Sequence, residues 1–199
     1  MQAYKQSTIY TGAPSALLMI LNHFDNSFEL SKENEFRLWQ QSCALPTRSS
    51  SIFSLANIAH QRKIPVKVIV GDAEYKFPNY RFLGYKLGEI EEATFFSELY
   101  LKEAKKAGIK IDEREFDIDE VKNFLKQKKI LILRLNAGVL RGQRSTANYI
   151  PVFDYKNGKF SLIDPKDGLK KDVDELKMKE ALETVKTKCK RDLRIAVFG

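Results

Sequence analysis

The sequence predicts an α+β fold, with a helical part over about 1–63 followed by a mainly sheet part over about 64–199. Apolar residues recur at helical spacing through the first part, and alternation at period two begins at Ile64. The pair Asn157-Gly158 separates two alternating segments and is typical of a tight β-hairpin turn. No linker-like stretch interrupts the chain, so we expect one domain over 1–199.

Three helices are expected in the first part. The first runs from Pro14 to Phe24, because a proline lacking its N–H is favoured in the first turn of a helix. It is apolar on almost every side, which predicts a central, buried helix. The second follows Ser31, whose hydroxyl is placed to cap it. The third covers about 51–62, where apolar residues again recur at helical spacing.

The second part is expected to mix strands and helices. A strand over 64–70 alternates at period two, and an unbroken apolar run over 130–135 predicts a central strand. The other elements expected here are a helix over 93–107, one short strand indicated by 109–111 and 114–116, a helix capped by Asp117 or Asp119 that ends at Lys126, a flexible loop over 138–145, hairpin strands over 148–155 and 160–165, a helix over 173–187 and a last strand over 193–198.

Between these elements, the segment 72–92 interleaves aromatic residues with lysine and arginine. Such a pattern can stack nucleic-acid bases, although a hairpin or irregular arm packed against the body fits it better. The formal net charge of +8 would also suit an acidic partner. The cations, however, are spread through every segment among acids, and no known nucleic-acid-binding motif accompanies them. A basic nucleic-acid-associated module centred on Tyr75 to Lys86 is therefore only the third functional hypothesis.

Composition narrows the class of protein further. The N-terminus lacks the apolar core of a signal peptide, and the longest apolar runs are too short to span a bilayer, so we expect a cytoplasmic protein without membrane contact. The two cysteines, Cys43 and Cys189, are far apart and have no neighbouring ligand pattern. Neither a disulfide framework nor a zinc site is indicated, and no metal or other cofactor is expected.

The start of the first helix is the most informative stretch. Backbone N–H groups around Gly12 should point out of the helix end, where the positive pole of the helix suits an anion, a thiolate or an oxyanion. No cysteine or serine stands at Gly12, and Ser15 follows too late in the helix to replace one. The turn has the form of a nucleophile turn without a nucleophile.

The turn and the later hairpin together resemble the C39-like group of papain-like cysteine peptidases. Gln6, the sequence Tyr10-Thr11-Gly12-Ala13-Pro14-Ser15-Ala16 and the hairpin Asn148 to Pro165 carry this resemblance, which extends over nearly the whole chain. In that group the turn reads Tyr-Thr-Cys-Gly-Pro-Ala, and the hairpin opens with histidine and ends in Asp-Pro. The resemblance implies a papain-like fold, in which the central helix packs on an antiparallel sheet.

The resemblance also assigns positions to a former catalytic site. It places Gln6 at the oxyanion position, Gly12 at the nucleophile position, Asn148 at the general-base position and Asp164 at the orienting-acid position. Papain-type hydrolysis needs a thiolate and an imidazole that takes and returns a proton. Gly12 has no side chain with which to attack, and an asparagine cannot transfer protons at neutral pH. The ordinary hydrolytic mechanism is therefore not available.

The leading hypothesis is a pseudo-peptidase that binds a peptide or protein segment in the former active-site cleft. The residues expected to border that cleft are Ser15, Ser50, Ser51, Arg141 and Tyr149.

The second hypothesis is an active cysteine- or serine-type hydrolase with a rearranged nucleophile. Ser7, Thr8, Thr11 and Ser15 flank the turn, but a hydroxyl nucleophile needs an adjacent base. His23 and His60 fall on predicted helices away from the hairpin, and Cys43 is by default a small buried residue.

Overall fold

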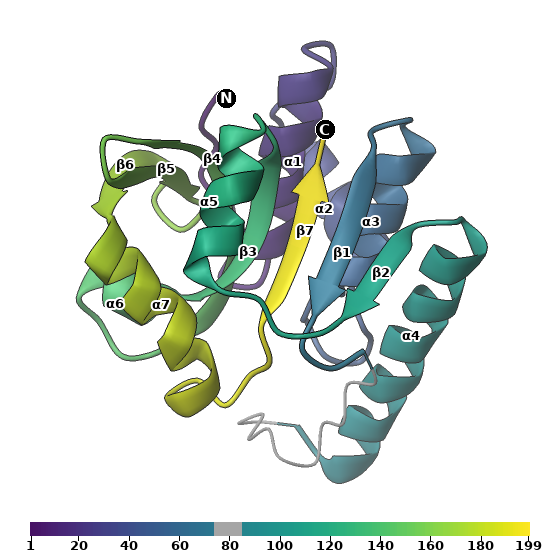
Figure 1. Ribbon diagram of the computed structural model, residues 1–199. Helices are drawn as coiled ribbons and strands as arrows, with labels where there is room; N and C mark the ends of the chain where they lie inside the picture. The colour runs from purple at the N-terminus through teal and green to yellow at the C-terminus, as the bar shows by residue number, and fades with distance from the viewer. Residues whose placement is uncertain (74–84) are drawn as a thin grey trace.

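The computed structural model describes residues 1–73 and 85–199 and shows an α+β fold, which confirms the predicted class (Figure 1). The described helices are α1 (Gly12–Phe24), α2 (Lys32–Ser42), α3 (Ile52–Gln61), α4 (Leu87–Lys106), α5 (Ile118–Lys126), α6 (Ala137–Arg141) and α7 (Glu175–Thr187). The described strands are β1 (Val66–Val70), β2 (Lys110–Glu113), β3 (Ile130–Asn136), β4 (Ala147–Lys156), β5 (Lys159–Asp164), β6 (Leu169–Asp174) and β7 (Arg194–Phe198).

The strands form one sheet in the order β2-β1-β7-β3-β4-β5-β6. β1 and β2 run parallel, whereas every other neighbouring pair in the described sheet is antiparallel. The chain returns from β1 to β2 through α4, and a crossover of this kind is what a parallel pair requires. The sheet is therefore mixed, which corrects the expectation of an antiparallel sheet.

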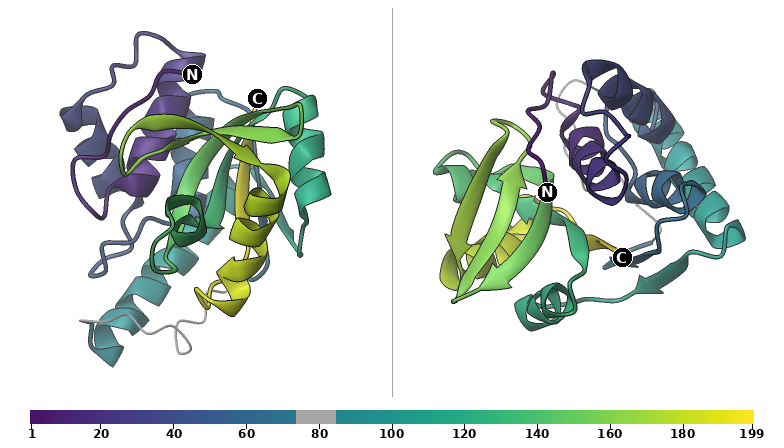
Figure 2. Two further views of the ribbon diagram at one scale, coloured as in Figure 1. Left: turned by 90° about the vertical axis from the view of Figure 1, so that its left-hand side faces the viewer. Right: turned by 90° about the horizontal axis from the view of Figure 1, so that it is seen from above.

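Helices cover both faces of the sheet (Figure 2). Ile132 of β3 lies in a core with α1, α3 and α4, whereas its neighbours Leu131 and Leu133 lie in a second core with α5 and α7. This alternation follows from the period of a strand, whose successive side chains point to opposite faces. Both faces of β3 are buried, which explains its unbroken apolar sequence.

The central helix α1 is buried from Pro14 to Asn22, as its apolar sequence predicts. It begins at Gly12, before Pro14, so the glycine belongs to its first turn. The predicted caps of two other helices are confirmed. Ser31 Oγ accepts a hydrogen bond from Asn34 N at 3.3 Å at the start of α2, and Asp117 Oδ1 accepts one from Glu120 N at 2.9 Å at the start of α5.

The hairpin β4–β5 forms as predicted. Asn157 and Gly158 adopt φ of 53° and 73°, the left-handed conformation that a type I′ turn requires at both central residues. The structure adds a third strand, β6, which pairs with β5 at the edge of the sheet. Its sequence was not predicted as a strand because lysine and aspartate fill its exposed positions.

Three other boundaries differ from the prediction. The segment 138–145 was expected to be a flexible loop, but α6 occupies its first part, because Asn136 Oδ1 caps the helix by accepting from Gly138 N at 3.2 Å. Helix α4 begins at Leu87 and takes in the end of the segment expected to form an arm. Residues 114–116 follow β2 and are not part of it. The rest of the expected arm, 74–84, lies outside the described residues.

Across the described segments, no helix combines the length and the apolar character that crossing a membrane would require.

Candidate functional site

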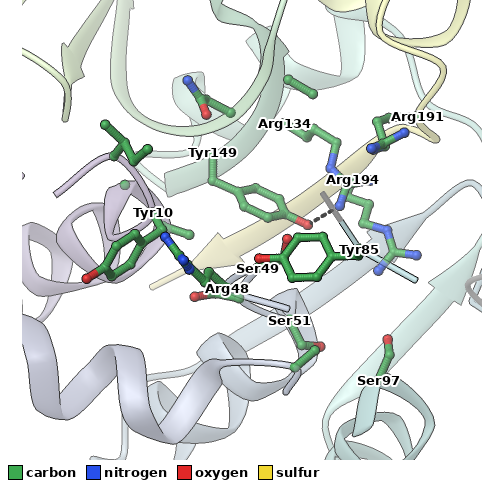
Figure 3. Close-up of a pocket in the computed structure, with 17 residues that line it drawn as sticks. Tyr10, Arg48, Ser49, Ser51, Tyr85, Ser97, Arg134, Tyr149, Arg191 and Arg194 are labelled. Carbon is green, nitrogen blue, oxygen red and sulfur yellow. Dashed lines mark hydrogen bonds between the residues drawn. The ribbon is translucent and has the colours of Figure 1, made fainter. Parts of the chain in front are cut away.

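A pocket of about 310 Å³ lies where α1 and α3 begin, beside β4 and β7 (Figure 3). It brings together several residues that are distant in sequence. Five of the predicted site residues line it: Gly12, Ser50, Ser51, Asn148 and Tyr149. The other described lining residues are Ile9, Tyr10, Ala13, Ala44, Arg48, Ser49, Tyr85, Ser97, Arg134, Ala147, Arg191 and Arg194.

Gln6 lies directly against Gly12, the residue that the resemblance places at the nucleophile position. A Cβ atom added at Gly12 would lie 2.9 Å from Gln6 Oε1, so a larger residue at Gly12 would need the Gln6 side chain to move. Gln6 Nε2 donates to Thr8 O at 2.6 Å, and Gln6 N donates to Pro165 O at 2.7 Å. The second bond ties the N-terminal segment to the end of the hairpin, so three predicted regions of the site meet here.

Arg141 connects Asn148 and Asp164, which the resemblance places at the base and acid positions. Its Nε donates to Asp164 Oδ2 at 2.8 Å and its Nη2 donates to Asp164 Oδ1 at 2.7 Å. With the Asn148 amide turned so that its oxygen faces the guanidinium, that oxygen accepts from Arg141 Nη1 at 2.9 Å. The guanidinium therefore contacts both residues, and the carboxylate of Asp164 points at a cation.

The Asp164 carboxylate is fully buried and strongly stabilised as an anion. Burial alone would raise its pKa, but hydrogen bonds from Arg141 and from Lys166 N, together with the charges of Arg141 and Lys171, bring the pKa below its ordinary value. Lys171 Nζ lies 3.3 Å from Asp164 Oδ2. The carboxylate thus stays charged and bound to cations at neutral pH.

Two residues expected to border the cleft lie elsewhere. Ser15 is fully buried, and its Oγ donates to Thr11 O at 2.8 Å and to Glu35 Oε1 at 3.0 Å. Arg141 is turned toward Asp164 and does not line the pocket. Both deviations have the same physical reason, because each polar side chain is drawn to a buried carboxylate that sequence reasoning did not place next to it.

Glu35 holds the N-terminal segment against α1. It accepts from Tyr4 Oη at 2.9 Å and from Ser7 N at 2.8 Å, and Ser7 Oγ also donates to it. Burial by itself would raise the pKa of the Glu35 carboxyl, but the hydrogen bonds that it accepts, those from Ser7 above all, outweigh burial and lower the pKa. A carboxylate with a lowered pKa is a weak general base at neutral pH.

The candidate replacement nucleophiles in the described structure are buried or bonded to their neighbours. Cys43 is buried, its Sγ donates to Thr47 O at 3.0 Å, and burial raises its pKa to about 11, so it is a thiol at neutral pH. Thr8 Oγ1 and Thr11 Oγ1 lie 3.1 Å apart and bond to each other. His23 and His60 lie in the last turns of α1 and α3, whereas the pocket is at the first turns.

Sequence reasoning missed the arginines of the pocket. Arg134 Nη1 donates to Asp192 Oδ1 at 2.6 Å, and Arg134 Nη2 donates to Tyr149 Oη at 2.7 Å. Arg194 Nε donates to the other oxygen, Asp192 Oδ2, at 2.7 Å. A signal was present in the sequence, because an arginine inside an otherwise apolar buried strand is expensive unless it is paired or functional.

The proposed aromatic and basic module is largely outside the described residues. Of the stretch Tyr75 to Lys86, only Tyr85 and Lys86 are described, and Tyr85 lines the pocket. In the described parts of the chain, no group of three or more histidine, cysteine, aspartate or glutamate side chains is placed to hold a metal ion.

Comparison with known proteins identifies the family of the chain. No curated protein matches the chain. A family model described as the Peptidase_C39 like family matches residues 1–195, which confirms the resemblance that the turn and the hairpin carry. The chain therefore belongs to the Peptidase_C39 like family.

Proposed function

We propose that this chain is a non-catalytic member of its family that binds a peptide or protein segment in the pocket at the start of α1. One observation carries the proposal. Arg141 binds both Asn148 and Asp164, which the resemblance places at the base and acid positions, and the position that it gives to the nucleophile is a glycine, Gly12.

The chemistry of acyl transfer supports the absence of catalysis. Hydrolysis through a covalent intermediate needs a nucleophile with an adjacent base that accepts and returns its proton. Gly12 offers no nucleophile, and the Asn148 amide does not titrate. A cation already satisfies Asp164, so this carboxylate is not available to orient a base. Cys43, with a pKa of about 11 and almost no exposure, does not replace the missing thiolate.

The architecture supports retention of the peptidase scaffold. α1 packs against β3 and β4, and Tyr149 of β4 lies in the same core as Leu17 of α1. This packing of a central helix on the hairpin strands is what a papain-like fold requires, and we infer that fold for the chain.

The pocket supports binding of a peptide. Its volume of about 310 Å³ is near the lower end of the range usual for ligand pockets, roughly 300–1,000 Å³. Ser49, Ser50 and Asn148 supply polar groups along its wall, while Tyr10 supplies an aromatic face. Ile9 also lines it and is 91 % exposed, which provides an apolar contact for a side chain of the peptide.

A capture experiment tests this function. The purified protein is incubated with a mixture of random-sequence heptapeptides, and retained peptides are identified by mass spectrometry. We expect retained peptides to be intact. We also expect Ser49→Trp to abolish retention, because Ser49 is exposed and lines the pocket, so an indole there fills the space.

The matched control is Asn26→Trp, which adds the same side chain at an exposed position beyond the last turn of α1, the end opposite the pocket. It should retain the same peptides as the unmodified protein. Equal retention by all three proteins would place the binding outside the pocket. Cleavage of the peptides, or covalent labelling of Cys43 by iodoacetamide in the folded protein, would instead favour a hydrolase with a rearranged nucleophile.

A further inference from the structure

The pocket is lined by four arginines and, among its described lining residues, by no aspartate or glutamate. Figure 3 shows Arg48 beside Tyr10 on one side and Arg134, Arg191 and Arg194 on the other. Guanidinium groups match the geometry of carboxylate and phosphate oxygens and bind them through paired hydrogen bonds. The composition of the wall therefore favours an anionic group in the pocket.

Two of these cations are fixed in place. Arg134 and Arg194 are 8 % and 2 % exposed, and both donate to the single carboxylate of Asp192. Arg134 also donates to Tyr149 Oη, and Arg194 Nη2 donates to Asp72 O at 2.9 Å. Side chains held in this way lose little conformational entropy when a ligand binds, which increases affinity.

Two helices also begin at the pocket. Gly12 and Ala13 of α1 line it, and so does Ser51, the residue that precedes α3. The N-terminal end of a helix carries partial positive charge and suits an anion. By itself this is a general property of helices, so the polar atom at the start of α3 is the more telling observation.

Ser51 is 7 % exposed, and its Oγ has no hydrogen-bond partner in the described structure. It stands at the N-cap of α3 but makes no side-chain capping bond there. A buried hydroxyl without a partner costs free energy, and such groups are rare in folded proteins. An oxygen of a ligand would supply the missing acceptor for its proton.

We propose that the pocket is an oxyanion subsite that receives a carboxylate or phosphate group of the bound peptide. Arg134 and Arg194 form its fixed wall, Ser51 donates from the start of α3, and Arg48 closes it from the exposed side, where its guanidinium lies 5.4 Å from the centre of the Tyr10 ring. The identification of a peptide rests on the proposed function, whereas the subsite itself can be tested with a simple ion.

The first experiment uses inorganic phosphate and acetate as probes. Each is titrated into the ¹⁵N-labelled protein at low salt, and the amide signals of Gly12 and Ser51 are followed by NMR. We expect saturable shifts at both amides, and weaker affinity as sodium chloride is added. Arg48→Gln should weaken phosphate binding about tenfold, as expected for loss of one charge-assisted hydrogen bond.

The matched control for Arg48→Gln is Arg62→Gln. Arg62 is also exposed and also lies over an aromatic ring, that of Phe28 at 4.9 Å, but it is outside this pocket. It should bind phosphate as the unmodified protein does. Ser51→Ala should weaken binding while the protein stays folded, because it removes a hydroxyl that has no described partner. Equal losses in Arg48→Gln and Arg62→Gln, or no saturable shift at Gly12 and Ser51, would overturn the subsite.

A second experiment identifies the source of the anion. A retained peptide is compared in three pairs: with a free or an amidated C-terminus, with glutamate or glutamine, and with phosphoserine or serine. If removing one of these charges abolishes binding, that charged group is the one that occupies the subsite. Retention that is unchanged by every charge removal would overturn the role of the subsite in peptide binding. Phosphate binding in a protein that retains no peptide would support the subsite and contradict the proposed function, so the two failures are distinguishable.

Discussion

Two clusters of arginine and aspartate lie near β4, and they differ in how each carboxylate is shared. In the first, one guanidinium, that of Arg141, binds both oxygens of Asp164. In the second, the guanidiniums of Arg134 and Arg194 each take one oxygen of Asp192. Neither Arg141 nor Asp164 lines the pocket, whereas both arginines of the second cluster do.

The two clusters also differ in the other groups that their side chains contact. Lys171 contacts Asp164, but it also bonds to Asp167 Oδ2 at 2.6 Å, so two cations meet two carboxylates in the first cluster. In the second cluster, Arg134 and Arg194 both bind the carboxylate of Asp192. The first cluster ties α6 to the end of β5, while the second holds two guanidiniums in the pocket wall, where they can meet a charged ligand.

Removing one arginine from each cluster gives the largest expected effect. Arg141→Met should lower the free energy of unfolding by about 3 kcal/mol, because it takes the bidentate partner from a fully buried carboxylate. Arg134→Met should cost less, about 1–2 kcal/mol, because Arg194 still binds Asp192. Urea unfolding followed by circular dichroism measures both values.

The double variant Arg141→Met/Asp164→Asn is the control for the first cluster. It should recover part of the loss, because an uncharged amide is less costly to bury without a cation than a carboxylate is. If Arg134→Met were as costly as Arg141→Met, the two clusters would be equivalent in stability and the distinction drawn from their geometry would fail.

Acid should reveal the same interaction at Asp164. The folded-state pKa of Asp164 is lowered, so its contribution is complete above the unfolded pKa of about 4 and is lost as the pH falls through the folded pKa. The difference in unfolding free energy between the unmodified protein and Arg141→Met should therefore be larger at pH 6 than at pH 2.5. Urea unfolding at the two pH values measures it.

A matched variant separates this effect from general acid sensitivity. Arg37→Met breaks the ion pair between Arg37 and Glu33, two exposed side chains. The small loss of unfolding free energy in this variant should change little with pH. A difference between the unmodified protein and Arg141→Met that stayed constant from pH 6 to pH 2.5 would show that Arg141 acts by packing instead of by charge.

Local sequence signals predicted much of the fold. The burial of α1, the cap Ser31 and the Asn157-Gly158 turn each depend on neighbours within a few residues, and each was predicted. Asp117, which caps α5, was one of two predicted candidates. The parallel pairing of β2 with β1 depends on residues about forty positions apart and has no local signal. Helix α6 is only five residues long, too short for apolar periodicity to identify it.

The site divides in the same way. Motif spacing located Gly12 and Asn148, and the structure places both at one pocket. The ion pair between Arg141 and Asp164 could not be predicted, because the two residues meet only after the chain has formed the hairpin. Arg134 and Arg194 come from β3 and β7, which become adjacent only in the assembled sheet. A charged residue that is buried between strands is visible in the sequence as a charge inside an apolar strand. The sequence does not show which residue pairs with it.

The smallest expected effect compares two serines that begin helices. Ser31→Ala should lower the free energy of unfolding by about 1 kcal/mol, because it removes the capping bond to Asn34 N. Ser51→Ala should leave stability within about 0.5 kcal/mol or raise it, because its hydroxyl is buried and makes no bond in the described structure. Urea unfolding in buffer without phosphate measures both. Phosphate should then separate the two variants. The ion should stabilise the unmodified protein and Ser31→Ala by the same amount, and Ser51→Ala by less. A cost for Ser51→Ala as large as that for Ser31→Ala would mean that Ser51 serves the fold, and the pocket wall would then lose its strongest sign of a missing ligand.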